Sequence, residues 1–160
     1  MALTLYYSPG SSSMATHIAL HEVGAPFELK LIELYRNDNR NAGYLAVNPE
    51  GKVPTLVIDG GPPLTEVAAT IHPSRRAGDE AWRAVFRLTD VRLGKNEWAV
   101  GRYSIADIHL FRLFWRFVDT LHPPASDYPN LSAHYDRMMA RDAVKKTLAA
   151  EGAVGYHLPR

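Results

Sequence analysis

Strand and helix signals alternate along the first seventy residues, and this order constrains the fold more than any other feature of the chain. Residues 3–7 (LTLYY) are apolar and aromatic, and Ser8-Pro9-Gly10 ends them as a turn. Apolar residues at helical spacing follow, with a serine available as N-cap and Gly24 as a natural end. Residues 27–34 (FELKLIEL) alternate well enough to form a second strand.

The next segment adds a hairpin and the start of another helix. Residues 35–51 are polar and turn-rich, with room for one short helix. A strand over 55–59, a Gly60-Gly61 turn and a brief strand at 63–64 come next, and a helix is expected to open at residue 65 or 66. The resulting order, β-α-β-(α)-β-β-α, is the thioredoxin-like pattern.

Strand signals disappear after residue 72, and helical periodicity replaces them. We therefore predict an α/β thioredoxin-like domain over residues 1–72, followed by an all-α domain over residues 73–160. In the first predicted helix of that region, one apolar stripe is expected to contain Trp82, Val85, Phe86, Leu88 and Leu93.

Charge and composition narrow the function classes. The chain has 18 Lys and Arg against 17 Asp and Glu, a net charge of +1, so nothing favours a nucleic-acid or membrane partner. The N-terminus lacks a secretory signal pattern, which predicts a cytoplasmic location. Because there is no cysteine, any thiol chemistry must use a thiol brought in from outside.

The run Ser11-Ser12-Ser13 allows two interpretations. Serines at this place are suited to cap the following helix and to form the turn before it, which needs no ligand. Alternatively, the start of the helix is a binding site, because backbone N–H groups and the helix dipole favour an anion there. The residues alone leave both interpretations open.

Several motifs in this order resemble the glutathione S-transferase family, most closely its bacterial beta class. They are YYSPGSSSMATHIAL (6–20), NPEGKVPTL (48–56), LTEVAA (64–69), GRYSIADIHLF (101–111) and the ending RDAVKKTLAAEG (141–152). The resemblance implies a detoxifying enzyme that adds the thiolate of glutathione, its co-substrate, to small hydrophobic electrophiles. A weakly active glutathione-binding stress or carrier module, and a glutathione-dependent isomerase, dehalogenase or etherase, remain alternatives.

The same resemblance assigns candidate catalytic residues. Ser12 stands where the beta class usually has a cysteine, and Ser13 matches the serine that often follows it. Serine cannot form a mixed disulfide with glutathione, so this substitution favours a hydroxyl that donates to the thiolate over thiol-transfer chemistry. Tyr7 is a second candidate donor, with packing beneath the first helix as its structural alternative.

Further residues are implied to hold glutathione. The family's cis bond before proline maps to Val53-Pro54, whose backbone would pair with the cysteinyl part of the tripeptide. Glu66 would bind the γ-glutamyl ammonium, and the N–H of Val67 its carboxylate. Lys52 or Arg36 is a candidate partner of the glycyl carboxylate.

The chain departs from the family after residue 72. Pro73 is expected to stop the helix that opens near residue 65, and the long helix that follows in the family is missing. That helix carries part of the electrophile pocket and of the dimer interface. The homodimer implied by the resemblance therefore lacks its usual surface, and the pocket should be open on one side.

Two smaller patterns have structural interpretations. Ser104-Ile105-Ala106-Asp107 reads as a capping box, which assigns Asp107 a role in stability and none in catalysis. His17 and His21 have the spacing of a metal pair, but no third ligand is near in sequence, so no metal is expected. We expect His109, inside an apolar helix, to be buried and hydrogen-bonded.

Overall fold

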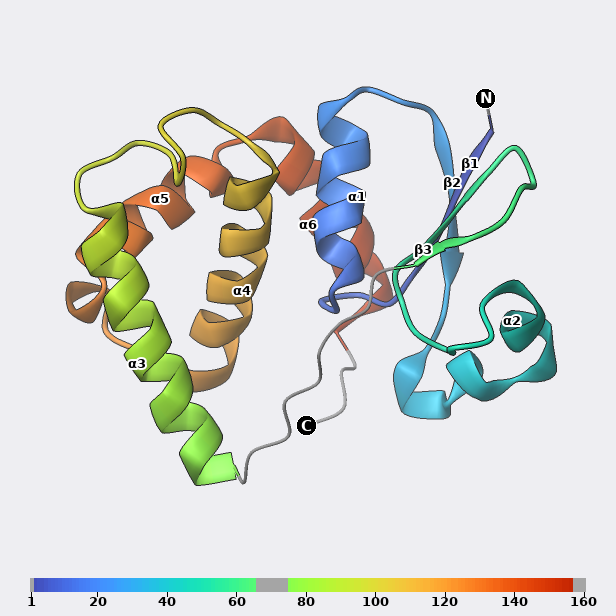
Figure 1. Cartoon of the computed structure of the whole chain (residues 1–160), viewed down its shortest axis with the longest axis horizontal. Coiled ribbons are helices and arrows are strands. Elements are labelled where there is room, and N and C mark those ends of the chain that lie inside the picture. The colour runs from blue at the N-terminus through green and yellow to red at the C-terminus, as the bar shows by residue number, and fades with distance from the viewer. Residues whose placement is uncertain (1, 66–74, 157–160) are drawn as a thin grey trace. The chain divides into compact units, whose positions relative to one another are not determined.

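The computed structural model describes residues 2–65 and 75–156. The chain divides into two compact units, one formed by Met1–Ala68 with Asp142–Arg160 and the other by Ala69–Arg141 (Figure 1). The expected boundary near His72 and the expected helix start at Thr65 or Glu66 lie outside the described residues or at their edge. The division predicted at 72/73 therefore stays a prediction.

A mixed four-stranded sheet forms the centre of the first unit. Its strands are β1 (Leu3–Tyr7), β2 (Phe27–Leu31), β3 (Thr55–Ile58) and β4 (Leu64–Thr65), in the order β2-β1-β3-β4. β1 runs parallel to β2 and antiparallel to β3, so that Leu5 pairs with Leu29 on one side and Leu56 on the other. This arrangement confirms the predicted thioredoxin-like order.

The two faces of the sheet are covered by different helices. α1 (Ser13–Glu22) packs on the face that carries Leu3, Leu5 and Tyr7, where Leu20 joins the buried cluster. α2 (Ala42–Val47) covers the opposite face and packs Tyr44 against Tyr6. The alternation along β1 separates these two sets, because successive side chains of a strand point to opposite faces.

The second predicted strand is shorter than its sequence pattern suggested. It stops at Leu31, and the chain turns into two short 3-10 helices, η1 (Leu34–Arg36) and η2 (Asp38–Arg40). Asn37 lies between them in the left-handed conformation that Asn tolerates. This turn ends the strand although residues 27–34 alternate.

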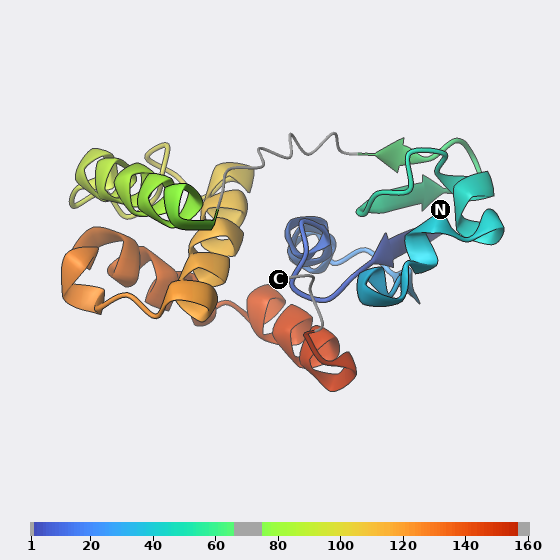
Figure 2. The same ribbon diagram turned by 90° about the horizontal axis from the view of Figure 1, so that it is seen from below.

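The last helix, α6 (Asp142–Val154), belongs to the first unit, although its sequence falls in the predicted helical region 73–160. It lies beside α1 in both views (Figures 1 and 2). Its buried face consists of Ala143, Val144, Thr147 and Glu151, which recur every three or four residues. The thioredoxin-like unit is therefore built from both ends of the chain.

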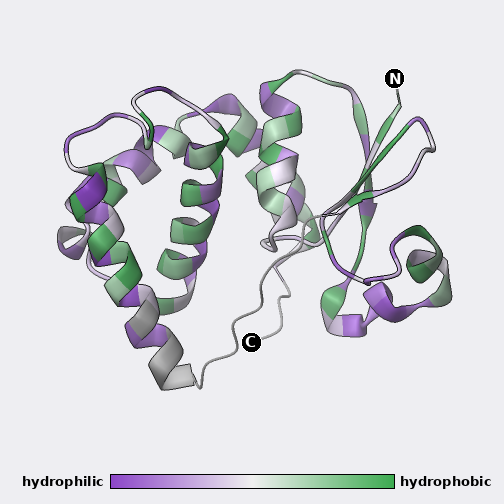
Figure 3. Ribbon diagram, in the orientation of Figure 1, coloured by the Kyte–Doolittle hydropathy of each residue, from purple (hydrophilic) through white to green (hydrophobic). Residues whose placement is uncertain are grey.

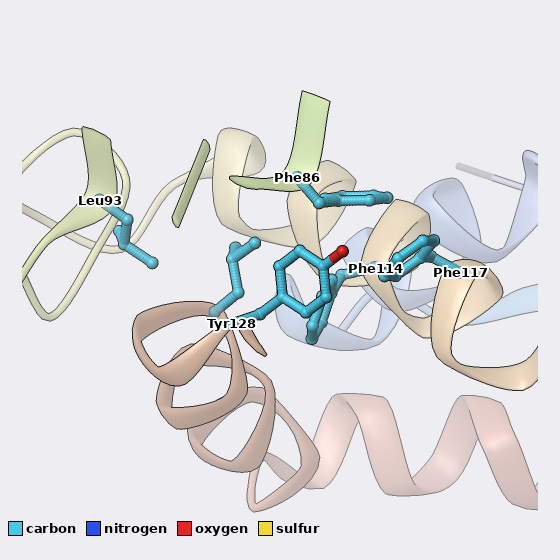
Figure 4. Packing of buried hydrophobic residues seen from close by; sticks show 6 residues of the cluster. Phe86, Leu93, Phe114, Phe117 and Tyr128 are labelled. Atoms are coloured by element: carbon cyan, nitrogen blue, oxygen red, sulfur yellow. The ribbon is translucent and has the colours of Figure 1, made fainter. Parts of the chain in front are cut away.

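The second unit is all-helical, as predicted. It contains α3 (Arg75–Leu93), α4 (Ile105–Leu121), the 3-10 helix η3 (Ala125–Asp127) and α5 (Pro129–Met139). α4 places apolar residues on the side that faces α3 (Figure 3). The core between them is largely aromatic and consists of Phe86, Leu93, Phe114, Phe117, Tyr128 and Leu131 (Figure 4).

The stripe predicted along α3 was too wide. Phe86 and Leu93 are buried, but Val85 and Leu88 are 57% and 52% exposed. At 100° per residue, Leu88 lies about 160° around the helix from Phe86, so the two cannot face the same core. Hydrophobicity alone did not separate the two sides of this helix.

Buried carboxylates fix the helix starts of the second unit. At the start of α4, Asp107 accepts the Ser104 N–H at 2.8 Å and the Ser104 hydroxyl accepts the Ala106 N–H at 3.2 Å, which confirms the capping box. Asp107 also accepts the Ala99 N–H at 2.8 Å and lies 3.1 Å from His134 Nε2. Its role is structural, since it joins α4, α5 and the preceding loop.

A second carboxylate performs the same task for α5. Asp90, a buried residue of α3, accepts the backbone N–H of Leu131 at 2.8 Å and the side-chain amide of Asn130 at 3.0 Å. The residue at the N-cap of α5, Tyr128, offers no capping side chain. Asp90 thus satisfies a helix-end donor that would otherwise be unpaired.

The expectation for His109 was wrong: it is half-buried, and the buried histidines within residues 2–65 and 75–156 are His17 and His134. No helix among the described residues is both long and apolar enough to cross a membrane.

Candidate functional site

The loop between β1 and α1 places the serines at the start of the helix. Ser13 is fully buried, and its hydroxyl donates to the Ser8 carbonyl at 3.0 Å and accepts the Ser8 N–H at 3.1 Å. The Ser11 hydroxyl accepts the Ser13 N–H at 3.2 Å and lies 2.8 Å from the Ser13 hydroxyl. These two serines hold the turn together, as the structural interpretation of the serine run expects.

Ser12 behaves differently from its neighbours. It occupies the N-cap of α1, but its side chain makes no capping hydrogen bond. Its hydroxyl instead donates to the carbonyl of Val53 at 2.8 Å, across the loop that precedes β3. Ser12 is half-buried, and the Val53-Pro54 bond is cis, as the resemblance implied. Ser12 and Val53 are therefore neighbours, although 41 positions separate them.

The first N–H groups of α1 already have acceptors, so the helix start would attract an anion mainly through its partial positive charge. The N–H groups of Met14 and Ala15 donate to the carbonyls of Ser11 and Ser12 at 3.2 and 3.3 Å, and the N–H of Ser13 is held by the Ser11 hydroxyl. The partial positive charge of the helix end remains. An anion beside Ser12 would feel this charge, while the hydroxyl of Ser12 would be the donor that can turn toward it.

The loop that presents Val53 is fixed from below by α2. The carbonyl of Lys52 accepts hydrogen bonds from the Tyr44 hydroxyl, from Asn48 Nδ2 at 2.9 Å and from the Thr55 hydroxyl at 3.2 Å. Burial raises the pKa of Tyr44, so its phenol stays protonated and can donate. This network fixes the position of Val53 relative to the start of α1.

Tyr7 lies deeper than a surface donor would. It is 4% exposed and packs with Leu3, Leu5 and Leu20, and its ring meets the edge of His17 at 5.7 Å. Burial, assisted by the negative charge of Glu151, raises the pKa of its phenol. Tyr7 is therefore a protonated core residue beneath α1, which agrees with its structural alternative.

Glu151 of α6 ties three parts of the first unit together. One carboxylate oxygen accepts the backbone N–H of Gly10 at 2.7 Å, and the other lies 3.1 Å from His17 Nδ1. Glu151 and His17 are both fully buried. The turn that carries the serines is thus anchored by a residue from the last helix of the chain.

The remaining residues that the resemblance implies for tripeptide binding either reach the surface or lie outside the residues that the structure describes. Lys52 lies 3.6 Å from Glu50, and Arg36 lies 3.2 Å from Glu33; the Arg36 side chain is exposed and the Lys52 side chain is half-buried. Glu66 and Val67 lie outside the described residues. Of the implied set, Ser12, Val53 and Pro54 are brought together by the structure.

Sequence reasoning missed the anchoring role of Glu151 and considered His17 only as a metal ligand. One signal was present: Glu151 falls on the apolar stripe of α6 with Val144 and Thr147, where a lone acid must find a buried partner. His17 falls between Met14 and Ile18 on the buried face of α1. Helical spacing placed both residues inside, but it could not show that they meet.

The sequence matches the family model of the glutathione S-transferase N-terminal domain over residues 11–72 and that of the C-terminal domain over residues 55–142. The second match alone spans more than half of the chain. This chain belongs to the glutathione S-transferase family.

Bacterial glutathione S-transferases are among the proteins that match nearly the whole chain. Glutathione S-transferase GstA of Escherichia coli O157:H7 is 27% identical over 201 aligned residues, which cover 94% of this chain and 99% of the relative. The solved structure of a beta class glutathione S-transferase from Sphingomonas chungbukensis is 28% identical, with a TM-score of 0.79 and coverage of 93% and 98%. A sphingomonad glutathione S-transferase solved with glutathione has the same TM-score at 26% identity, over 93% of this chain and 98% of its own.

The length of the alignment can also be compared with the expectation that one helix of the family is missing. The alignment with the E. coli relative extends over 201 positions, whereas this chain has 160 residues. The relative therefore contains internal sequence that has no counterpart here. This difference in length agrees with the expectation that the helical region is shortened.

Proposed function

We propose that this protein is a glutathione transferase in which the hydroxyl of Ser12 stabilises the thiolate of bound glutathione for attack on a small hydrophobic electrophile. The observation that carries the proposal is the 2.8 Å hydrogen bond from Ser12 to the Val53 carbonyl. It brings the candidate thiolate donor beside the backbone that would hold the cysteinyl residue. A thiolate is a stronger acceptor than a neutral carbonyl, so the hydroxyl is expected to turn to the sulfur.

Contacts within the loop favour Ser12 over the other two candidates. The Ser13 hydroxyl is engaged twice with the Ser8 backbone and is fully buried. Tyr7 packs in the core beneath α1. Ser12 is the candidate that is half-buried and whose hydroxyl can exchange partners without opening the turn.

We assign the binding of the tripeptide to Val53, to Glu66 and to the N–H of Val67. Lys52 or Arg36 would bind its glycyl end. The sphingomonad relative solved with glutathione supports this binding. Because the helical region is shortened, we expect the electrophile pocket to be open on one side and the family's usual homodimer interface to be incomplete. Light scattering during gel filtration measures the oligomeric state directly.

The first experiment is a calorimetric titration with reduced glutathione, with Glu66→Ala as the control for the γ-glutamyl contact. We expect saturable binding at one site per chain that is lost in the variant. Absence of binding to the unmodified chain would contradict the glutathione site itself.

The second experiment tests the role of Ser12 with glutathione and 1-chloro-2,4-dinitrobenzene. Ser12→Ala removes a hydrogen bond to a charged sulfur, which predicts a loss in kcat of about ten- to a hundredfold. Glutathione affinity should change little, and the pH at which the rate rises should move upward, because the thiolate loses a donor. Tyr7→Phe is the matched control and should keep most of the activity. The reverse pattern, with Tyr7→Phe inactive and Ser12→Ala active, would assign the donor to Tyr7.

A further inference from the structure

The first unit has a pocket that is separate from the proposed glutathione site. It lies at the C-terminal end of α1 and holds about 460 Å³. Its walls come from α1, from the chain entering β2 and from α6, and include His17, His21, Phe27, Leu29, Lys146 and Ala150. Ser12 and His21 are at opposite ends of α1, about 13 Å apart along the axis at ~1.5 Å per residue. A ligand bound here would therefore not occupy the thiolate site.

Aromatic surface dominates one wall of this pocket. The rings of His17 and His21 stack with centroids 5.1 Å apart, and Phe27 meets both edge-on at 5.6 and 5.0 Å. His17 is fully buried behind this wall, while His21 and Phe27 are half-buried, so part of their surface faces outward. A flat apolar ligand can stack on such a surface.

The charge of the residues that line the pocket indicates which polar group a ligand would carry. Lys146, an exposed residue of α6, lines the pocket, and none of the described residues that line it is an acid. Burial lowers the pKa of His21, and the neighbouring His17 and Lys146 lower it further, so this imidazole is neutral at pH 7. The positive charge at the rim therefore comes from Lys146, and an anion is favoured beside it.

A second observation concerns His17, which belongs to the same aromatic wall of the pocket. His17 uses Nδ1 toward Glu151, while its buried Nε2 has no hydrogen-bond partner in the described part of the chain. Buried polar atoms are rarely left without a partner unless a ligand or solvent meets them. The pocket therefore combines an apolar stacking surface, a cation at the rim and an unsatisfied nitrogen behind the wall.

We propose that this pocket binds an aromatic monocarboxylate, with its ring against His21 and Phe27 and its carboxylate beside Lys146. The proposal is independent of the conjugation chemistry, because none of these residues belongs to the glutathione site. The pocket volume is within the range usual for small-molecule sites, about 300–1,000 Å³.

Titration of the full chain with 2-naphthoate, followed by calorimetry and by NMR, tests the proposal in the presence of saturating glutathione. A ligand of this size should bind with a Kd of about 0.1–1 mM. 2-Naphthalenemethanol has the same ring without the charge and should bind about three- to fivefold more weakly, as expected for loss of an exposed ion pair. The NMR shifts should centre on His21 and Ala150.

The matched variants are Lys146→Met and Lys145→Met. Both residues are exposed on α6, but Lys145 lies outside the pocket and faces Asp142 at 3.8 Å. Lys146→Met should weaken 2-naphthoate binding about three- to fivefold, and Lys145→Met should leave it unchanged. Equal effects of the two variants, shifts centred on Ser12, or no saturable binding up to several times the expected Kd would each overturn the proposal.

Discussion

Replacing Glu151 by alanine should destabilise the first unit strongly. The side chain is fully buried and serves two partners, the Gly10 N–H at 2.7 Å and His17 Nδ1 at 3.1 Å. Alanine leaves both without a partner, and each buried unsatisfied group costs about 1–3 kcal/mol. We therefore expect the free energy of unfolding to fall by about 4 kcal/mol, before any contribution from the cavity.

Two control variants separate the role of the carboxylate from general damage to α6. Glu151→Gln keeps the volume and one oxygen acceptor, so a smaller loss of about 1–2 kcal/mol is expected. Asp142→Ala removes an acid that is 89% exposed at the start of the same helix and should change stability by less than about 0.5 kcal/mol.

Urea unfolding measured by circular dichroism gives the total effect, and amide exchange of Gly10 reports the local one. Tryptophan fluorescence follows the second unit, because Trp82, Trp98 and Trp115 all lie in it. If Glu151→Ala left the Gly10 amide protected and shifted unfolding no more than Asp142→Ala does, the anchoring role would be refuted.

Three further predictions concern the second unit. Asp107→Ala should lower its free energy of unfolding by about 3 kcal/mol, since the Ser104 and Ala99 N–H groups lose their acceptor; a change below 1 kcal/mol in urea unfolding would contradict this. Asp90→Ala should cost about 2 kcal/mol and speed amide exchange at Leu131, whose N–H it accepts; unchanged exchange would argue against the cap. Burial lowers the pKa of His134 below the unfolded value of about 6.5, despite the opposing effect of the hydrogen bond that its ring donates to Asp107. Folding therefore favours the neutral imidazole. The stability that His134 contributes is fully present above pH 6.5. It is lost as the pH falls through the lower folded pKa, by at most about 1.4 kcal/mol per pH unit. His134→Gln should flatten this decline, and an unchanged pH profile would assign it to other groups.

Much of the fold could be predicted because local patterns are strong in this chain. The strand at residues 3–7, the turn at Gly60-Gly61 and the capping box before Asp107 each depend on neighbours in sequence. Periodicity failed where a helix has apolar residues on two sides, as at Val85 and Leu88 of α3. It also could not assign α6 to the first unit, because that depends on a pairing between distant parts of the chain.

The candidate site was predictable to a similar degree. The serine run and the proline of residue 54 were identified, and the family resemblance added their roles. Which serine faces the neighbouring loop was not predictable, since Ser11, Ser12 and Ser13 have the same chemistry and differ only in direction. The partner of Gly10 was also hidden, because it comes from Glu151, 141 positions later.

The position of α6 has a consequence for how the protein is made. A ribosome releases α1 long before α6, and the partners His17 and Glu151 are 134 positions apart. Until the last helix emerges, the nascent first unit has an imidazole and a Gly10 amide with no acceptor, and the apolar face of α1 stays uncovered. The helices of the second unit form a compact unit within Ala69–Arg141 and can pack earlier. The part of the chain that is synthesised first is therefore the last to be completed.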